Sequence, residues 1–410
     1  MTVVLERPYE FIPPYEGTLW PSAIQKLRLV DLYLAKKEGV VDYRLIGLEH
    51  FQQALDAGQS IMLAPNHCRY ADPLVLGWPA RELGVHLHAV ASWHLFNKSA
   101  FDRFAIRRMG AFSLNREGTD RPSLEAAIDI LARGSRPLII YPEGTTNRTN
   151  DVLKPLLDGV AFMARAAAKK RAREGLPPVV ILPTAIKYLC VRDSRDWMRR
   201  QLTALEDRFG WSPQGHRGIL DRTVRLAEAM LALKEIEYLG RSQTGDLRHR
   251  RDELMQELIR VAEAGVGIQT SDPGEIRNRV RQVRSEVVRQ YFTSDDRDSD
   301  RADRLRGHAR AADLAQELLS YPDCYLQAEE VTDTRIVETI QRMQEQIEGR
   351  SNNEVELKAV IEFSEPITVD VKRPPRDQAD PMMKQLHDRL TAMLTRLSSQ
   401  ARDAERGGLR

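Results

Sequence analysis

The sequence predicts an α/β fold in which a mixed central sheet is flanked by helices and interrupted by an all-helical insertion. Between residues 41 and 190, short apolar runs alternate with amphipathic helical patterns, as in chains that build a sheet with crossover helices. From about 196 to 350 the pattern changes to long helices rich in Arg and Glu, and strand composition returns at 355–370. Because a strand follows the helical block, we interpret the block as an insertion.

Five apolar runs in the first half of the chain have the length and composition of strands. They occupy residues 41–46, 60–65, 86–91, 137–141 and 178–187. Four helical patterns lie between or beside them, at 49–58, 72–84, 123–134 and 156–175. Asp72 and Ser123 have the side chains that suit a helix N-cap.

Both ends of the chain predict amphipathic helices. Residues 18–38 place Ile24, Leu27, Val30 and Leu34 at helical intervals, and residues 381–400 carry a second apolar stripe. Its members are Met383, Leu386, Leu390, Met393, Leu394 and Leu397. Such helices pack on their own domain or lie on a membrane surface, and both interpretations stay open. The acidic and basic run at 293–304 predicts an exposed linker.

Composition excludes several classes of protein. The net charge is +2 with 29% charged residues, which gives no overall field for nucleic acid. Cys68, Cys190 and Cys324 match neither a disulfide framework nor metal spacing, so we expect a reducing, cytoplasmic environment. The N-terminus is too charged for a signal peptide, and we expect no membrane-spanning helix.

The stretch PNHCRYADP, Pro65–Pro73, ends an apolar run and places His67 five residues before Asp72. On a regular helix that spacing separates two side chains by roughly 140°, so the pair must straddle a turn between strand and helix. There the carboxylate can accept from one imidazole N–H and leave the other nitrogen to take a proton. The nucleophile is then a substrate hydroxyl, although His67 and Asp72 also fit a strand end and a helix cap. Cys68 could act as a thiol nucleophile, but its sequence position favours a buried thiol without a chemical role.

Two further stretches predict an anion site. In IIYPEGTTNRTND, Ile139–Asp151, a strand runs into Glu143-Gly144-Thr145, where glycine permits a tight turn that exposes backbone N–H groups. In GAFSLNREG, Arg116 carries a planar guanidinium suited to a phosphate. Alone, these stretches equally describe a solvated turn and a surface ion pair.

Three histidines raise the question of a metal site. His86 and His88 lie two apart on a predicted strand, and His94 follows soon after. No carboxylate or thiol is spaced to complete a ligand set, so we predict no metal.

Taken together and in order, NHCRYAD, GAFSLNR, YPEGTT and ILPTAIKY resemble the four sequence blocks of the glycerolipid acyltransferase family. This family contains the glycerol-3-phosphate and lysophosphatidate acyltransferases. The resemblance covers roughly 41–190 and 355–372 and is carried jointly by the four blocks. It implies that residues 41–195 and the closing strand, 351–374, form one acyltransferase domain of that fold. The remaining segments are an N-terminal helical segment (1–40), the insertion (196–350), and a C-terminal helix and tail (375–410).

The resemblance also implies roles for individual residues. His67 resembles the general base and Asp72 its partner, with Asn66 shaping the turn. Arg116 resembles an acceptor-phosphate contact, and Pro183 resembles the proline of the fourth block. The acceptor residues implied by the third block are Glu143, Gly144 and Thr145. Two departures stand out: Thr146 takes the place of a common arginine, with Arg148 following as a substitute, and the helical insertion is foreign to the family pattern.

The function that follows is acyl transfer from an acyl thioester of CoA or acyl carrier protein to a glycerol-phosphate or lysophospholipid acceptor. No cofactor is expected, and no covalent acyl-enzyme forms. The expected partners are the thioester donor, the glycerolipid acceptor and a membrane surface, with no nucleic acid. Two alternatives stay open: a non-catalytic lipid- or partner-binding protein on the same fold, and an acyltransferase for a non-phosphate polyol or lipid.

Overall fold

The computed structural model describes residues 5, 7–118, 120–269, 275–293, 299–327, 331–375, 378 and 380–401. Within these residues eight strands form one sheet, in the order β1-β7-β6-β2-β5-β3-β4, with β8 paired to β6. The strands are β1 (Val40–Ile46), β2 (Ser60–Pro65), β3 (His88–Ser92), β4 (Ala111–Leu114), β5 (Leu138–Ile139), β6 (Val179–Cys190), β7 (Leu357–Phe363) and β8 (Ile367–Thr368).

The sheet is mixed, as the sequence predicts. Strand β2 runs parallel to β5 and β6, while β7 runs antiparallel to β6 and parallel to β1. The long strand β6 makes this possible, because its first half pairs with β2 and its second half with β7. Strand β4 was not predicted, since its four residues are too few for a recognisable pattern.

Side chains alternate between two apolar cores, one on each face of the sheet. On β2, Ile61 and Leu63 enter the first core, whereas Met62 and Ala64 enter the second. The first core is covered by α3 (Leu48–Asp56), α4 (Asp72–Val75), α5 (Gly77–Glu82), α9 (Arg195–Arg208) and α14 (Asp333–Glu348). The second is covered by α7 (Arg121–Arg133), α8 (Gly159–Arg173) and α15 (Pro381–Ser398). The predicted stripe of α15 is buried there, which confirms that helix.

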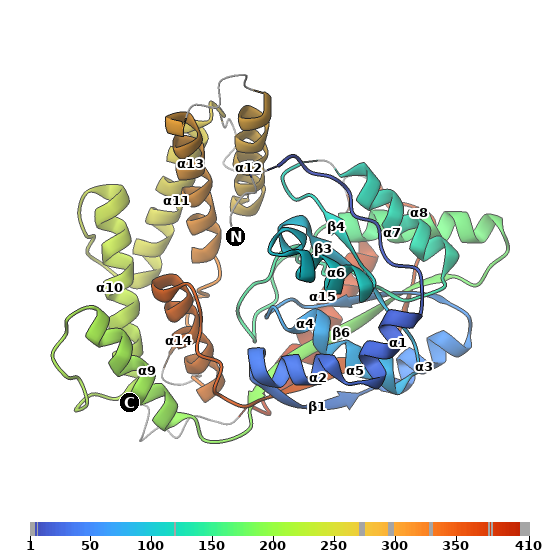
Figure 1. Cartoon of the computed structure of the whole chain (residues 1–410), viewed down its shortest axis with the longest axis horizontal. Coiled ribbons are helices and arrows are strands. Elements are labelled where there is room, and N and C mark those ends of the chain that lie inside the picture. Colours follow the sequence, from blue (N-terminus) through green and yellow to red (C-terminus); the bar gives the residue numbers. More distant parts are fainter. Residues whose placement is uncertain are drawn as a thin grey trace.

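The helices between β6 and β7 form a second body beside the sheet (Figure 1). After α9 come α10 (Ile219–Leu239), α11 (Leu247–Gly265), α12 (Ile276–Thr293), α13 (Ser299–Leu318) and α14. Helices α11, α12 and α13 share a third apolar core of their own, whereas α14 returns to the sheet and joins the first core. None of the helices in the described ranges combines the length and apolarity that crossing a bilayer requires.

Several local predictions need correction. The N-terminal helix is divided into α1 (Leu19–Lys26), α2 (Leu29–Tyr33) and a π-helical turn, Leu34–Glu38, because Arg28 adopts a left-handed conformation with φ 51°. Asp120, not Ser123, caps α7, and its carboxylate accepts from the Ser123 N–H. Helix α4 begins at Asp72 itself, whose carboxylate bonds backward to the turn.

Part of the predicted linker falls outside the described residues. Residues 294–298 are among those not described, and α13 already begins at Ser299. The second part of the linker prediction is therefore wrong, because Arg- and Asp-rich residues there belong to a helix.

Truncating the α14 contact with the sheet tests whether the insertion is part of the domain core. Ile340 is fully buried in the first core, so Ile340→Ala is expected to lower the free energy of unfolding by about 2–5 kcal/mol. Ile236→Ala on α10, where the side chain is half exposed, is the matched control. Urea unfolding followed by circular dichroism measures both; equal midpoints for the two variants would contradict the packing described above.

Candidate active site

The first motif forms the junction between β2 and α4. After Pro65 the chain leaves the sheet, turns through Asn66–Ala71 and enters α4 at Asp72. This turn places the His67 Nδ1 atom 2.8 Å from the Asp72 Oδ2 atom. The sequence thus brings the imidazole and the carboxylate together across a turn rather than along a helix.

The Asp72 carboxylate is fully buried and is held by four donors. Its Oδ2 atom accepts from the backbone N–H groups of Cys68 (2.7 Å) and Arg69 (2.9 Å), and from His67. Its Oδ1 atom accepts from the Tyr188 hydroxyl of β6 at 2.8 Å. Burial and the nearby Asp72 charge raise the pKa of Tyr188 well above its ordinary value, so the phenol stays a donor. A carboxylate held this way fixes one tautomer of His67, with the proton on Nδ1.

The second ring nitrogen of His67 faces Thr146. The Thr146 hydroxyl lies 2.9 Å from the His67 Nε2 atom and donates to it when Nδ1 carries the proton. The Tyr141 ring stacks on the imidazole, with centroids 3.9 Å apart, and fixes its plane. An Asp, a His and a hydroxyl thus stand in series, which is the geometry of a base with its orienting carboxylate.

Glu143 holds the two motifs together. Its Oε1 atom accepts from the His67 backbone N–H at 2.7 Å, and its Oε2 atom accepts from the Asn147 amide and the Lys154 N–H, both at 2.9 Å. Burial raises the pKa of Glu143 to about 7, and the hydrogen bonds from His67 and Lys154 act against that rise. The side chain is buried and occupied on both oxygens, so in this structure it braces the turn.

Gly144, Thr145 and Arg148, which follow Glu143 in the same turn, do not share its hydrogen bonds to the His67 and Lys154 backbone. Gly144 has φ +72°, and a Cβ atom there would stand 2.3 Å from Leu157, so the glycine is needed for the turn. The Thr145 hydroxyl is buried without a hydrogen-bond partner. The Arg148 guanidinium pairs with Glu345 of α14.

The charges of two arginines, Arg148 and Arg116, act on Tyr70. The Arg148 guanidinium stands 4.6 Å from the centroid of the Tyr70 ring. Arg116, in the loop after β4, lies near enough for its charge to lower the pKa of Tyr70 while burial raises it. Burial, followed by the nearby charge of Arg284, lowers the pKa of Arg116 to about 10. The two predicted anion-binding residues therefore share one aromatic neighbour.

Asn66 and Pro183 both make contacts within the sheet. The Asn66 side chain bonds to both backbone groups of Ile186, donating at 3.0 Å and accepting at 2.7 Å, which ties the turn to β6. Pro183 is buried within β6 opposite Ala64 of β2, and its carbonyl accepts from the Ser364 N–H. Both positions are structural in this arrangement.

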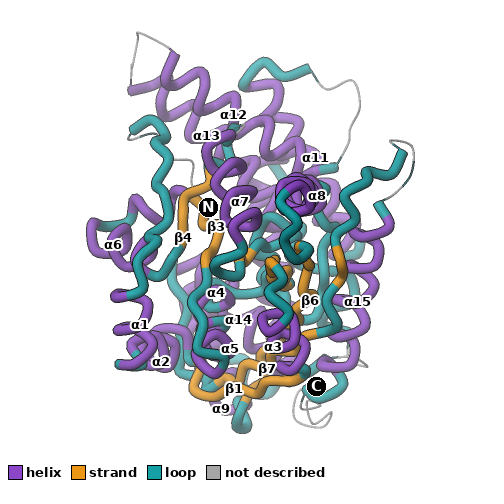
Figure 2. Tube along the Cα trace, turned by 90° about the vertical axis from the view of Figure 1, so that its right-hand side faces the viewer, coloured by secondary structure: helices purple, strands orange, loops and turns teal. Residues whose placement is uncertain are grey.

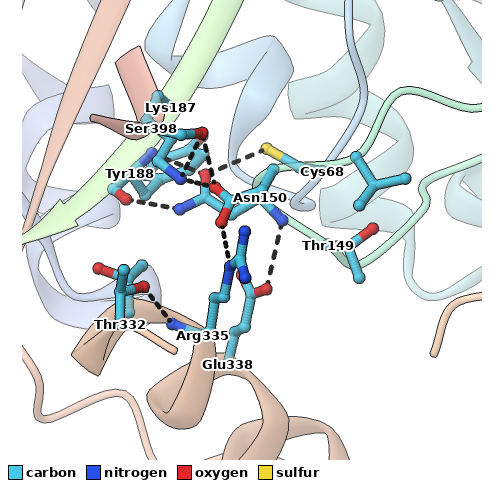
Figure 3. A network of polar contacts seen from close by, with 12 residues as sticks. Cys68, Thr149, Asn150, Lys187, Tyr188, Thr332, Arg335, Glu338 and Ser398 are labelled. Carbon is cyan, nitrogen blue, oxygen red and sulfur yellow. Dashed lines mark hydrogen bonds and ion pairs between the residues drawn. The ribbon is translucent and has the colours of Figure 1, made fainter. Parts of the chain in front are cut away.

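A buried polar network joins this junction to the insertion, as Figure 3 shows. Asp151, at the end of the third motif, pairs with Lys187 of β6 and with the Arg335 Nε atom of α14 at 2.6 Å. Asn150 exchanges two hydrogen bonds with the Tyr188 backbone, and its own N–H donates to Glu338 at 3.3 Å. Burial raises the pKa of Glu338 and lowers that of Lys187.

The insertion makes further contacts with the loops that follow β2 and β5 and carry His67 and Thr146. The Arg277 guanidinium of α12 donates to the carbonyl of Glu143 at 3.2 Å, and the Arg69 guanidinium donates to Gln341 of α14 at 2.9 Å. Lys154 donates to the Ser320 hydroxyl at 3.2 Å. The loops that carry His67 and Thr146 are therefore enclosed by α12 and α14 as well as by the sheet.

A cavity of about 1980 Å³ opens beside Thr146, between the loops that carry Tyr70 and Thr146 and the insertion helices. We call it the interhelical cavity. Tyr70, Thr146 and Arg148 line its catalytic end, so Thr146 separates the largely buried His67 from this space. Of the residues predicted for the acceptor, Arg148 lines this cavity, whereas Glu143 is not among its lining residues.

The histidines considered for a metal bind separate partners. His86 contacts the Ser22 hydroxyl, His88 the carbonyl of Gly110, and His94 the hydroxyl of Ser92. Within the described part of the chain, no group of three or more His, Cys, Asp or Glu side chains is arranged for a metal ion.

Sequence reasoning missed several members of the site. Tyr188 lies in the fourth block, but the sequence predicts a role only for Pro183 of that block. Thr146 enters the sequence prediction only as a departure from the family pattern. The signal that could have found them is topological: β2, β5 and β6 are neighbours and parallel, so the segments after β2 and β5 meet at one edge. The partners on α14 had no sequence signal, because 188 residues separate Asn150 from Glu338 and 184 separate Asp151 from Arg335.

Comparison with known families agrees with this geometry. Residues 43–187 match the family model described as Acyltransferase, a segment that begins in β1, ends in β6 and contains His67, Asp72 and Thr146. No curated protein matches the sequence. Residues 43–187 therefore form a segment similar to the acyltransferase family, which is consistent with the resemblance of the four sequence blocks to the glycerolipid acyltransferases.

Proposed function

We propose that this protein transfers a fatty acyl group from an acyl thioester to the hydroxyl of a glycerol-phosphate or lysophospholipid acceptor. The observation that carries the proposal is the series Asp72–His67–Thr146, in which the His67 Nε2 atom faces a hydroxyl beside the interhelical cavity. The acceptor hydroxyl takes the place that the Thr146 hydroxyl occupies. His67 then removes its proton as the oxygen attacks the thioester carbonyl, and the proton passes to the departing thiolate.

The phosphate of the acceptor fits the two arginines beside Tyr70. Arg148 is held by Glu345, so an incoming phosphate replaces that carboxylate as its partner. Arg116 supplies a second positive charge close to the same ring. The donor is an ester of CoA or acyl carrier protein, and the reaction belongs to phospholipid biosynthesis.

Two other functions use the same fold. A non-catalytic lipid- or partner-binding protein would need no basic Nε2 atom beside a cavity, and an acyltransferase for a neutral polyol would need no arginine pair. Turnover by the wild-type protein excludes the first. Comparing glycerol-3-phosphate, lysophosphatidate and a neutral lysolipid as acceptors decides the second.

Removing the base is expected to abolish most turnover. General-base catalysis contributes about 10²- to 10⁴-fold, so His67→Ala should lower kcat by that factor while the protein stays folded. The measurement is consumption of an acyl thioester by chromatography, with circular dichroism as the folding check. His249→Ala, an exposed histidine of α11, is the control. Undiminished turnover of His67→Ala would remove the proposed base.

The position of Thr146 favours a second route. A hydroxyl 2.9 Å from the Nε2 atom of a carboxylate-held histidine is the arrangement of an activated nucleophile. In this route Thr146 takes the acyl group as an ester, His67 passes the proton to the thiolate, and the acceptor hydroxyl then attacks that ester.

Replacing Thr146 separates the two routes. In the direct mechanism Thr146→Val keeps kcat within about tenfold, because no bond forms to this residue, and wild-type protein incubated with donor alone gains no mass. In the covalent route Thr146→Val loses about 10²-fold or more, and the wild-type protein gains the mass of one acyl group. Initial rates and intact-protein mass spectrometry give the two readings.

An exposed apolar surface near the N-terminus suits a membrane. Helices α1, α2 and α6 (Ala100–Arg108) run along one edge of the molecule (Figure 2). Their exposed apolar residues form what we call the N-terminal patch: Leu19, Trp20, Leu27, Leu29, Leu32, Phe101 and Phe104. The rings of Trp20 and Phe104 contact each other, with centroids 5.1 Å apart, which joins α1 to α6. Exposed Lys26, Arg28 and Lys98 add positive charge, so we propose peripheral contact with the cytoplasmic face of an anionic membrane.

Charging the N-terminal patch is expected to weaken membrane binding. Burying a leucine side chain contributes about 1.5–3 kcal/mol, so the double variant Leu29→Asp/Leu32→Asp should lower vesicle binding more than tenfold. Cosedimentation with phosphatidylglycerol vesicles measures it, and Leu176→Asp, an exposed leucine outside the patch, is the control. Binding that falls equally in both variants would assign the effect to charge alone.

A further inference from the structure

The interhelical cavity is larger than a site for a small acceptor. Its volume is about 1980 Å³, whereas sites for drug-sized ligands measure roughly 300–1,000 Å³. One end lies at Tyr70 and Thr146, and the other walls come from α10, α11, α13 and α14 of the insertion and from the loop 320–327. A ligand that fills it must be long, and one end of that ligand lies next to His67.

The cavity exists because two apolar cores diverge along α10. Leu226 packs into the first core beneath the sheet, whereas Leu231, little more than a turn later, packs into the core of the helical bundle. Helix α14 follows the sheet and α13 follows the bundle. The helix faces that border the gap between them line the interhelical cavity.

Those faces expose more apolar than polar surface, although Lys234, Thr339 and Gln346 are among their residues. Residues at helical spacing border the cavity on α10 and α14, where positions 227, 230, 231 and 234 on α10 and positions 339, 343, 346 and 347 on α14 share one side of their helix. The apolar members that enclose its centre are Met230, Leu231, Leu314, Leu318, Met343 and Ile347.

Charged side chains at the cavity wall neutralise one another. Arg148 pairs with Glu345, Arg284 with Asp313, and the Arg251 Nη2 atom with Asp323 at 2.9 Å. Arg342 also lines the cavity, where it packs over the Tyr321 ring at 3.5 Å and keeps its buried Nη1 atom without a hydrogen-bond partner among the described residues. The centre of the wall, between these charged side chains, is apolar. It suits an uncharged aliphatic chain, which gains about 0.8 kcal/mol for each methylene removed from water.

We propose that the interhelical cavity binds a long aliphatic chain of a lipid substrate, with the functional end of that chain at His67 and its tail between α10, α13 and α14. The proposal rests on the proposed acyl transfer and assigns to the insertion a role in selecting chain length. The chain belongs either to the thioester donor or to a lysolipid acceptor, since both carry the same aliphatic chemistry.

The test fills the cavity and reads out chain-length preference. Met230→Trp on α10 is expected to lower kcat/KM for a hexadecanoyl thioester by about 10²-fold, because each excluded methylene costs about fourfold and roughly four are displaced. Turnover of a butanoyl thioester should be unchanged. If the tail of the acceptor occupies the cavity instead, the loss appears with lysophosphatidate but not with glycerol-3-phosphate, whatever the donor length.

Two more variants keep the outcome interpretable. Ile347→Trp fills the cavity from α14, so it should act in the same direction even if one substitution disturbs folding. Ile236→Trp, a half-exposed position on α10 outside the cavity wall, is the matched control and should change nothing.

A binding measurement separates this inference from the proposed reaction. A fluorescent hexadecanoic acid should bind the wild type, and bind Met230→Trp and Ile347→Trp at least tenfold more weakly, even if no acyl transfer is found. Equal probe binding in all variants, or unchanged chain-length profiles in active ones, overturns the cavity assignment while leaving His67-dependent turnover intact. Loss of carrier-protein binding without a change in chain preference overturns it as well and makes the cavity a protein-docking surface.

Discussion

The buried carboxylate of Asp72 is the interaction on which the rest of the site depends. A carboxylate without solvent is tolerated only when donors surround it, and here two backbone N–H groups, a phenol and an imidazole do so. These four donors belong to the turn after β2 and to β6, so the charge aligns two neighbouring strand ends. The orientation of His67 is a consequence of that alignment.

Glu143 is a second buried carboxylate whose oxygens are surrounded by hydrogen-bond donors. It accepts from the backbone of His67 and of Lys154, and so joins the turn after β2 to the segment after β5. The helical insertion then closes the outer side, because α14 supplies Glu338 and Arg335 to the third motif and α12 supplies Arg277. The insertion therefore supports the loops that carry His67 and Thr146, and it also forms the walls of the cavity beside them.

Much of the candidate site could be predicted from the sequence, and the contacts that could not be predicted depend on tertiary structure. The pairing of His67 with Asp72 followed from a five-residue spacing that only a turn can close, and the mixed sheet followed from alternating strands and helices. Glu143 was assigned to the acceptor, because a sequence shows a carboxylate at a strand end without showing which N–H groups surround it. Thr146 was seen as a departure in the third motif, but its contact with His67 depends on two turns meeting across the sheet edge.

The sequence by itself determined most of the strands, the amphipathic C-terminal helix, the order of the four motifs and the place of the insertion, because these depend on residue type and spacing along the chain. It did not predict β4 or the break at Arg28 in the N-terminal helix. The tertiary structure decided which groups face one another over long separations: Tyr188 on Asp72, Thr146 on His67 and Glu345 on Arg148. It also decided that α14 joins the sheet core while α13 stays with the bundle. That divergence creates the interhelical cavity, and no local pattern records it, because a cavity is the absence of a contact between distant elements.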